Sequence, residues 1–189
     1  DGAERAYPLP APMITYALPV LPAVKINEVL PRPSREVPSA AASGPGEFIE
    51  IYNASDQEVD LEGHFLSDSR RNPTKWRIPA GSKVKPKGFL VFIADGSNQG
   101  NHTSFKLSNS GEFLGIFGRM EEGNLMVDST AFRGVRSGES WGASPDGSKN
   151  FRAWKDPTPG ARNIPKIPEE LLKKKAEEQK AEGSPTEGN

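Results

Sequence analysis

The sequence predicts an all-β protein, built as a sandwich or barrel, with an extended N-terminal arm and a short C-terminal helix. The first observation is the presence of 19 glycines and 18 prolines among 189 residues, which favours many turns and few long helices. The second is that short apolar or alternating runs recur between turn signals through residues 24–163. About eight short strands in such a rhythm are typical of a sandwich or barrel.

Residues 1–23 form the first of three zones. Five prolines between positions 8 and 22 disfavour a helix and favour extended backbone, with one short strand possible at 13–18. One interpretation is a linker from a preceding domain, and the other is an arm that docks on a neighbouring molecule. A docking arm would use its large apolar side chains, which are Tyr7, Leu9, Ile14, Tyr16, Leu18 and Leu21.

Residues 24–163 form the second zone, long enough for one domain with its own core. The early strands are expected at residues 24–30, 47–54, 59–66 and 75–78. In 47–54 the apolar residues alternate, so Ile49 and Ile51 share one face while Glu50 lies on the other. The run at 59–66 is interrupted by Gly63, which predicts a broken strand.

The later strands of this zone are expected at residues 88–94, 103–107, 113–118, 125–132, 140–143 and 151–154. Nearly every position of 88–94 is apolar, which predicts a strand covered on both faces at the centre of the fold. Turn residues at 95–96, 110–111, 122–124 and 145–147 separate the strands.

Residues 164–189 form the third zone, a charged helical tail that we expect to be exposed and partly frayed. Pro168 and the two glutamates after it favour a helix start, and Gly183 favours its end. The alternative is a helix that docks on a partner. It would then use its narrow apolar stripe, which consists of Ile164, Ile167 and Leu171.

Composition argues against most enzyme classes. Cysteine is absent, and no metalloprotease, nucleophile-elbow or phosphate-loop motif occurs. The 24 basic and 25 acidic residues nearly cancel, so no global nucleic-acid or membrane footprint is expected. No apolar run approaches the roughly 18 residues that a membrane helix needs. We therefore predict a protein that is not an enzyme and has no catalytic residue, metal or cofactor.

Several short fragments in residues 24–163 follow one another in the order of a known family. The first fragments are Ile26-Asn27-Glu28-Val29-Leu30, Glu47-Phe48-Ile49-Glu50-Ile51-Tyr52-Asn53, Val59-Asp60-Leu61-Glu62-Gly63 and Trp76-Arg77-Ile78-Pro79-Ala80-Gly81. The later fragments are Pro86-Lys87-Gly88-Phe89-Leu90-Val91, Ser140-Trp141-Gly142, Pro145-Asp146-Gly147 and Pro157-Thr158-Pro159-Gly160-Ala161-Arg162-Asn163. In order and spacing they resemble the bacterial form of the lamin tail domain.

The resemblance implies an immunoglobulin-like antiparallel β-sandwich at 24–163. It also implies a non-catalytic module of a secreted or surface protein of bacteria, located extracellularly, at the cell surface or in the periplasm. The family's nuclear members follow a coiled-coil rod, and this chain has no heptad rod, so the nuclear role does not carry over. The chain begins at Asp1 without a signal-peptide core, which fits a mature exported chain or a piece of a longer protein.

Two carboxylates, Glu28 and Glu50, stand on early strands and could form a general acid and base pair. The favoured interpretation is structural. Together with Asn27 and Asn53, they would bond loop backbones at the ends of a sandwich.

Metal and sugar sites are weakly indicated. The loop at 94–101 resembles a calcium loop but lacks the closing glutamate. His64 and His102 have no ligand spacing, which argues against zinc. Three tryptophans could stack on sugars, although core or rim packing is the favoured role. They are Trp76, Trp141 and Trp154.

A local basic cluster is the candidate anion-binding surface. Its residues are Arg70, Arg71, Lys75, Lys83, Lys85 and Lys87. In a strand the last three lysines would share one face and could meet an acidic polysaccharide or nucleic acid. The favoured interpretation is protection of a sheet edge by lysine and Pro86. Few aromatic residues lie among these basic residues, so nucleic acid is not the expected partner.

The leading hypothesis is a non-enzymatic, exported structural or protein-interaction module. The partners would be protein chains in a homo- or hetero-oligomer, or neighbouring domains of a larger chain. Its arm and tail would hold the β-sandwich to these partners. The alternative is a module that binds surface polysaccharide or nucleic acid through the basic cluster.

Overall fold

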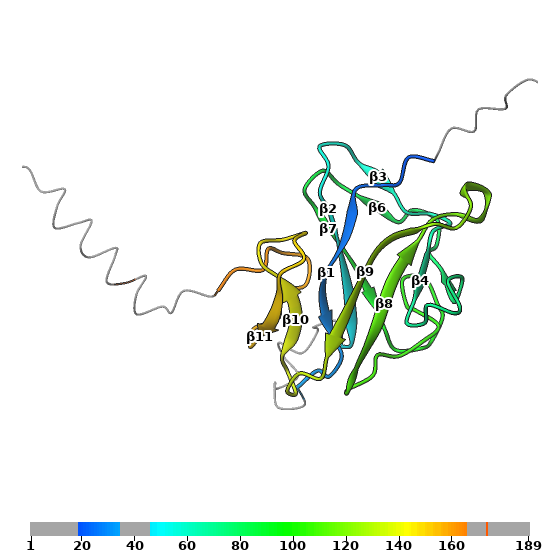
Figure 1. Cartoon of the computed structure of the whole chain (residues 1–189). Helices are drawn as coiled ribbons and strands as arrows, with labels where there is room; N and C mark the ends of the chain where they lie inside the picture. Colours follow the sequence, from blue (N-terminus) through cyan, green and yellow to red (C-terminus); the bar gives the residue numbers. More distant parts are fainter. Residues whose placement is uncertain (1–18, 35–45, 166–172, 174–189) are drawn as a thin grey trace, which may run out of the picture.

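Two antiparallel sheets pack face to face in the computed structural model of this chain, which describes residues 19–34, 46–165 and 173 (Figure 1). The larger sheet has the strand order β11-β10-β1-β2-β7, and the smaller one has the order β5-β4-β8-β9. Strands β3 and β6 pair separately as a two-stranded ribbon. The predicted all-β, immunoglobulin-like sandwich is confirmed.

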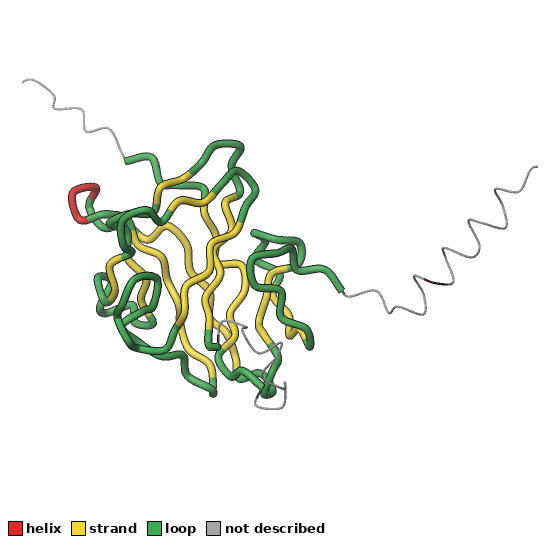
Figure 2. Tube along the Cα trace, turned by 180° about the vertical axis from the view of Figure 1, so that it is seen from behind, coloured by secondary structure: helices red, strands yellow, loops and turns green. Residues whose placement is uncertain are grey.

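The five-stranded sheet contains β1 (Val24–Leu30), β2 (Phe48–Asn53), β7 (Phe89–Ile93), β10 (Ser140–Ala143) and β11 (Phe151–Trp154). The four-stranded sheet contains β4 (Phe65–Ser67), β5 (Trp76–Arg77), β8 (Gly111–Phe117) and β9 (Met126–Arg133). The small ribbon joins β3 (Val59–Asp60) to β6 (Lys83–Val84), and the 3-10 turn η1 covers Met120–Glu122. Figure 2 shows how loops join these strands around the sandwich.

Alternate residues of facing strands fill the core. Ile26 on β1 and Ile51 on β2 meet side chains of the second sheet, including Leu66, Leu114 and Ile116, and all five are fully buried. Alternation puts each of these side chains on the inner face of its strand. The core therefore lies between the two sheets.

A β-bulge at Asn27 changes which residues of β1 face the core. The pairing register with β2 shifts between Ile26 and Glu28, so one extra residue is inserted there. Val24, Ile26 and Val29 consequently belong to the core. Simple alternation would place Glu28 on the same face as Ile26. The bulge instead turns Glu28 outward, directly opposite Glu50 in the register with β2.

Asp128 on β9 ties the two sheets together near this bulge. Its Oδ2 accepts a hydrogen bond of 3.0 Å from the backbone N–H of Ile26. Its Oδ1 lies 2.6 Å from Lys149 Nζ and 3.4 Å from Lys25 Nζ. A buried carboxylate is stable only where such partners replace water, and here they come from β1 of the larger sheet and from the loop between β10 and β11.

Two strand predictions were wrong in their details. The run at 59–66 forms two strands, β3 and β4, in different sheets, with a turn at Gly63, whose φ is 78°. The run at 103–107 forms no strand and takes part only in the isolated bridge between Lys106 and Asp95. A positive φ favours glycine and ends the regular strand geometry, which explains the first difference.

The predicted central position of residues 88–94 was also wrong, because β7 lies at the edge of its sheet. Most side chains of β7 are nevertheless half-buried, because neighbouring residues cover the strand. The ring of Phe89 lies 5.2 Å from that of Tyr52, and the backbone of Ile93 bonds to residues 101 and 103. The central strands are β1 and β2, whose outward polar residues hid their burial in the sequence.

The predicted arm and helix fall largely outside the described residues. Residues 1–18 of the arm and residues 166–172 and 174–189 of the tail are not described. Within the described ranges, no helix is long and apolar enough to cross a membrane.

The Asp128→Ala variant should lower the free energy of unfolding by about 2–4 kcal/mol, because it leaves a buried N–H of Ile26 without its acceptor. Urea denaturation would measure the loss. The control is Asp56→Ala, which removes a carboxylate that is 86% exposed and should change the stability by less than about 0.5 kcal/mol. Equal effects of the two changes would contradict the proposed role of Asp128.

Candidate functional site

The strongest candidate site is a buried polar cluster on the outer face of β1 and β2. Glu28 and Glu50 are both fully buried and stand opposite each other across the two strands. Residues between β10 and β11, and residues after β11, cover this face and supply the hydrogen-bond donors described below. Both carboxylates face away from the apolar core.

Glu28 binds the segment that follows β11. The backbone N–H of Thr158 donates to both of its oxygens at 3.1 Å, and Thr158 Oγ1 donates to Oε2 at 3.2 Å. The hydroxyl of Ser140 on β10 also donates to Glu28 Oε1. One carboxylate thus joins β1, β10 and the chain at residue 158.

Glu50 binds the same segment two residues further on. Its Oε2 accepts a hydrogen bond of 2.6 Å from the backbone N–H of Gly160, and its Oε1 accepts one of 2.9 Å from Asn27 Nδ2. Asp146 supplies a third carboxylate, whose Oδ1 accepts from Asn27 Nδ2 at 3.1 Å and from the backbone N–H of Asn163 at 2.9 Å. Each of the three carboxylates therefore accepts a hydrogen bond from the segment that follows β11.

Two amide side chains complete the cluster. Asn27 Oδ1 accepts a hydrogen bond of 2.9 Å from the backbone N–H of Gly147. Asn163 Nδ2 donates to the carbonyl oxygens of Asn27, at 3.2 Å, and of Ala143, at 3.0 Å. We call this set the clamp. It consists of the side chains of Asn27, Glu28, Glu50, Asp146 and Asn163 with the backbone groups that they bind.

Burial dominates the electrostatics of the clamp. Desolvation raises the pKa of Glu50 to about 8, against the opposing effect of its two hydrogen bonds, and the neighbouring Glu28 and Asp146 carboxylates raise it further. Burial also raises the pKa of Glu28. A raised pKa suits a general acid, but a general acid must also reach a substrate. Here the two carboxyl groups are covered and bonded to loop backbone, which is the structural role expected for them.

Asn53 has the same role at the opposite end of β2. Its Nδ2 donates to the carbonyl oxygens of Gln57 at 2.7 Å and Val84 at 3.0 Å. Its Oδ1 accepts from the backbone N–H and the hydroxyl of Ser55. Asn53 therefore fixes the loop between β2 and β3 against β6.

The histidines and the loop at 94–101 do not form a metal site. His102 Nδ1 lies 2.7 Å from Oδ2 of Asp95. The other carboxylate oxygen of Asp95, Oδ1, accepts a hydrogen bond from the backbone N–H of Ser97. His64 is buried elsewhere, and burial lowers its pKa. Over residues 19–34 and 46–165, no group of three His, Asp or Glu side chains could hold a metal ion.

The tryptophans pack in the protein. Trp76 lies in the core with its ring edge-on to Phe92, at a centroid distance of 5.2 Å. Trp154 is buried, and its Nε1 donates 3.1 Å to the carbonyl of Gly142. Trp141 packs against the core and stacks on Phe151. These contacts agree with the packing role.

The basic cluster is split over two places in the fold. Strand β6 covers only two residues and Lys87 has a φ of 52°, so the strand expected through Lys83, Lys85 and Lys87 does not form. Lys83 lies 3.7 Å from Glu58, and Lys87 lies 3.1 Å from Asp56. These acidic neighbours reduce the positive charge of this face.

The remaining basic residues lie in or near the turn between β4 and β5. Lys75 Nζ lies 2.6 Å from Asp68, and Arg70 stacks over the ring of Phe113 at 4.6 Å. Arg71 is exposed. The cluster therefore combines exposed cations with cations that are already paired or stacked.

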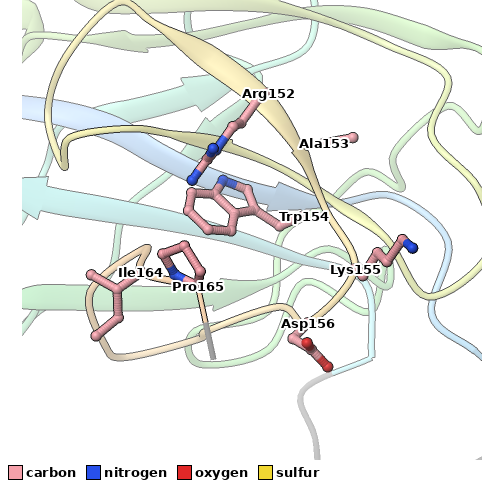
Figure 3. A pocket seen from close by; sticks show the side chains of 7 residues that line it. All are labelled: Arg152, Ala153, Trp154, Lys155, Asp156, Ile164 and Pro165. Carbon is pink, nitrogen blue, oxygen red and sulfur yellow. The ribbon is translucent and has the colours of Figure 1, made fainter. Parts of the chain in front are cut away.

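Two predicted attachment residues lie at the ends of the described chain. Leu21 is 37% exposed just before β1, and Ile164 is 58% exposed after the clamp. Ile164 lines a shallow hollow beside β11 with Trp154 and Arg152, whose guanidinium stacks 3.9 Å from the indole ring (Figure 3). The other seven predicted contacts lie outside the described residues, namely Tyr7, Leu9, Ile14, Tyr16, Leu18, Ile167 and Leu171.

A family model of the lamin tail domain matches residues 19–133, which is more than half of the chain. The chain belongs to the lamin tail domain family. Lamin tail domains are a non-enzymatic family with an immunoglobulin-like β-sandwich, which agrees with the observed fold. No curated protein and no solved structure matches the chain. The lamin tail domain match ends with the last residue of β9, so β10, β11 and the covering half of the clamp lie beyond it.

Sequence reasoning missed three residues that organise the site. Asp128 was assigned only to a strand, Asp146 to a turn and a family fragment, and Asn163 only to a family fragment. Asn163 follows a loop rich in proline and glycine yet is buried. A polar residue that ends such a loop is the kind of position that can anchor the loop to a sheet.

We expect the stability of the protein to fall as the pH rises from about 5 to about 8. The Glu50 carboxyl has a pKa of about 8 when folded and an ordinary value of 4.5, so the folded state holds an extra proton in this range. The loss should be on the order of 2–4 kcal/mol, measured as the free energy of unfolding in urea at each pH.

The Glu50→Gln variant isolates this effect, because it removes the titrating group. The stability difference between the variant and the parent should depend on pH in that range. For the matched control Glu58→Gln, a half-exposed surface carboxylate, the difference should stay constant. If the difference in the free energy of unfolding between the parent and Glu50→Gln is the same at pH 5 and pH 8, the burial of an ionisable Glu50 is contradicted.

Proposed function

We propose that this protein is a non-enzymatic structural and protein-interaction module, in which a rigid β-sandwich is held to partner chains by the N-terminal arm and the C-terminal tail. The observation that carries the proposal is the position of exposed apolar side chains. Val20, 96% exposed, and Leu21 precede the first strand, while Ile164 follows the clamp. Exposed apolar residues at such positions favour contact with another molecule.

The ends of the described chain support attachment at two places. Figure 1 draws the blue segment that leads into β1 and the orange segment that follows β11 on different sides of the sandwich. A body with this geometry can bridge two neighbours, or join a neighbouring domain to a partner. The buried carboxylates favour the same conclusion, because they are engaged in holding the sandwich together.

The arm has two plausible ways to attach. Residues 13–18 form an apolar stretch without proline, which suits addition of a strand to an exposed sheet edge. The flanking prolines suit an extended segment that lies across a neighbour's surface. The proposal places the protein outside the bacterial cytoplasm, at the cell surface, in the periplasm or in the medium, on the basis of the resemblance to bacterial lamin tail domains.

A second candidate function is binding of an acidic polysaccharide through the basic cluster. It is supported by the exposed side chains of Arg71, Lys85 and Lys87. The acidic neighbours of Lys83 and Lys87 weigh against it.

Deletion of residues 1–18 should abolish or weaken association of the protein with its partner chains. Static light scattering and co-purification from the native source would measure it, with circular dichroism as the control for folding. The deletion leaves the described sandwich intact, including the backbone bond of 2.8 Å from Ala54 N–H to Ala23 O. Association that is unchanged by the deletion would end the role of the arm.

The polysaccharide alternative predicts binding that weakens with added salt. The triple variant Lys83→Glu, Lys85→Glu and Lys87→Glu should abolish binding to an anionic polysaccharide such as heparin, measured by affinity chromatography. A matched control is Lys106→Glu with Lys155→Glu, which changes exposed lysines away from this face. If the triple variant is retained on the column as strongly as the parent, this function is excluded.

A further inference from the structure

Large exposed apolar side chains gather just before β1 and around the start of β9. Of the six that are exposed in the described part of the chain, all except Ile164 lie before β1 or around the start of β9. We call these five residues the end patch. It consists of Val20, Leu21, Met120, Leu125 and Met126.

The strands place these residues at one end of the sandwich. Strands β1 and β9 point the same way in Figure 1, and the bond from Ile26 N–H to Asp128 fixes them side by side. The residues before Val24 and before Asp128 therefore lie at the same end. Residues 19–23 and the η1 turn are both drawn toward this end in the two overall views (Figures 1 and 2).

The side chains of the end patch are well exposed for their type. Met120 is 60% exposed on the η1 turn, and Leu125 and Met126 are 44% and 42% exposed at the start of β9. Single exposed apolar residues are ordinary on protein surfaces, but a group of five at one end points to a covering partner.

The chain itself supplies an apolar segment of the right length. Residues 6–24 carry no charged side chain, and residues 13–18 are Met, Ile, Thr, Tyr, Ala and Leu. Six extended residues span about 20 Å, twice the spacing of about 10 Å between packed sheets, so this segment can cross the end of a sandwich.

Two prolines favour a neighbouring molecule as the recipient of this segment. The residue before a proline is driven into extended backbone, which applies to Leu18 before Pro19 and to Leu21 before Pro22. Extended backbone at these two positions favours a chain that runs on from β1 without reversing. A sharp reversal at these residues would be needed to bring residues 13–18 back onto their own end patch.

We propose that residues 13–18 of one copy of this chain cover the end patch of a second copy. This inference deepens the proposed function and rests on it, since it names the partner of the arm. The exchange is reciprocal in a two-fold dimer, because each copy offers both the segment and the patch. It would bury Ile14, Tyr16 and Leu18 against Met120, Leu125 and Met126.

The three methionines of the chain provide the test, since Met120 and Met126 belong to the patch and Met13 to the segment. Mild hydrogen peroxide converts exposed methionine to its sulfoxide with release of water, and mass spectrometry reads each site. In the full-length protein, Met120 and Met126 should be oxidised severalfold more slowly at high protein concentration than at low concentration.

The matched variants keep the full chain. Ile14→Asp, Tyr16→Asp and Leu18→Asp together should abolish the protection and the dimer seen by light scattering. The control Ala3→Asp, Ala6→Asp and Ala11→Asp adds the same charge to the same arm and should retain both.

Each other outcome overturns the inference. Protection that does not depend on concentration would mean that the segment covers its own patch. If the parent shows no protection while arm deletion still weakens association, the arm binds a different surface, and the proposed function survives alone. If the arm affects neither protection nor association, both proposals fail.

Discussion

The β-bulge at Asn27 is the feature on which the rest of the structure depends. One extra residue in β1 keeps Ile26 and Val29 in the core while turning Glu28 outward, opposite Glu50. Without it, a carboxylate would enter the apolar space between the sheets, at a cost of several kcal/mol. Just before the bulge, the N–H of Ile26 binds Asp128 on the second sheet, and β10 pairs with β1 only at Glu28 and Val29. A single local change therefore sets the core and positions the clamp, next to the bond that joins the two sheets.

The clamp explains an unusual distribution of polarity over the larger sheet. Its central strands carry buried carboxylates on their outer face, while the apolar strand β7 lies at the edge. In each case the residues on the outer face of the strand match the groups that cover them. The loops around β11 offer backbone N–H groups, such as that of Gly160, which need acceptors, so Glu50 fits beneath them. Strand β7 is instead covered by the ring of Tyr52 and by a short backbone bridge at Ile93.

Much of this fold follows from local sequence, and the remainder does not because it depends on long-range pairing. Residues 24–30, 140–143 and 151–154 were assigned to strands with the bounds that the structure has, since alternation and turn residues are local signals. The centrality of β7 was misjudged because an apolar run reports burial, not sheet order. The structural role of Glu28 and Glu50 could be expected from their type. Their partners Thr158 and Gly160 could not, because more than a hundred residues separate them in sequence.

The clamp also bears on how the sandwich can serve as a mechanical link. The arm continues directly into β1 at Val24, and the tail leaves the protein just after Asn163. The Asn163 side chain donates to the backbone carbonyl of Asn27, which belongs to that same strand. A pull between the two ends of the domain would therefore act on β1 and on the clamp, with the four-stranded sheet outside the direct path. Strand β1 is paired on both sides and almost wholly buried, so the strand that continues the arm is firmly held in the sandwich.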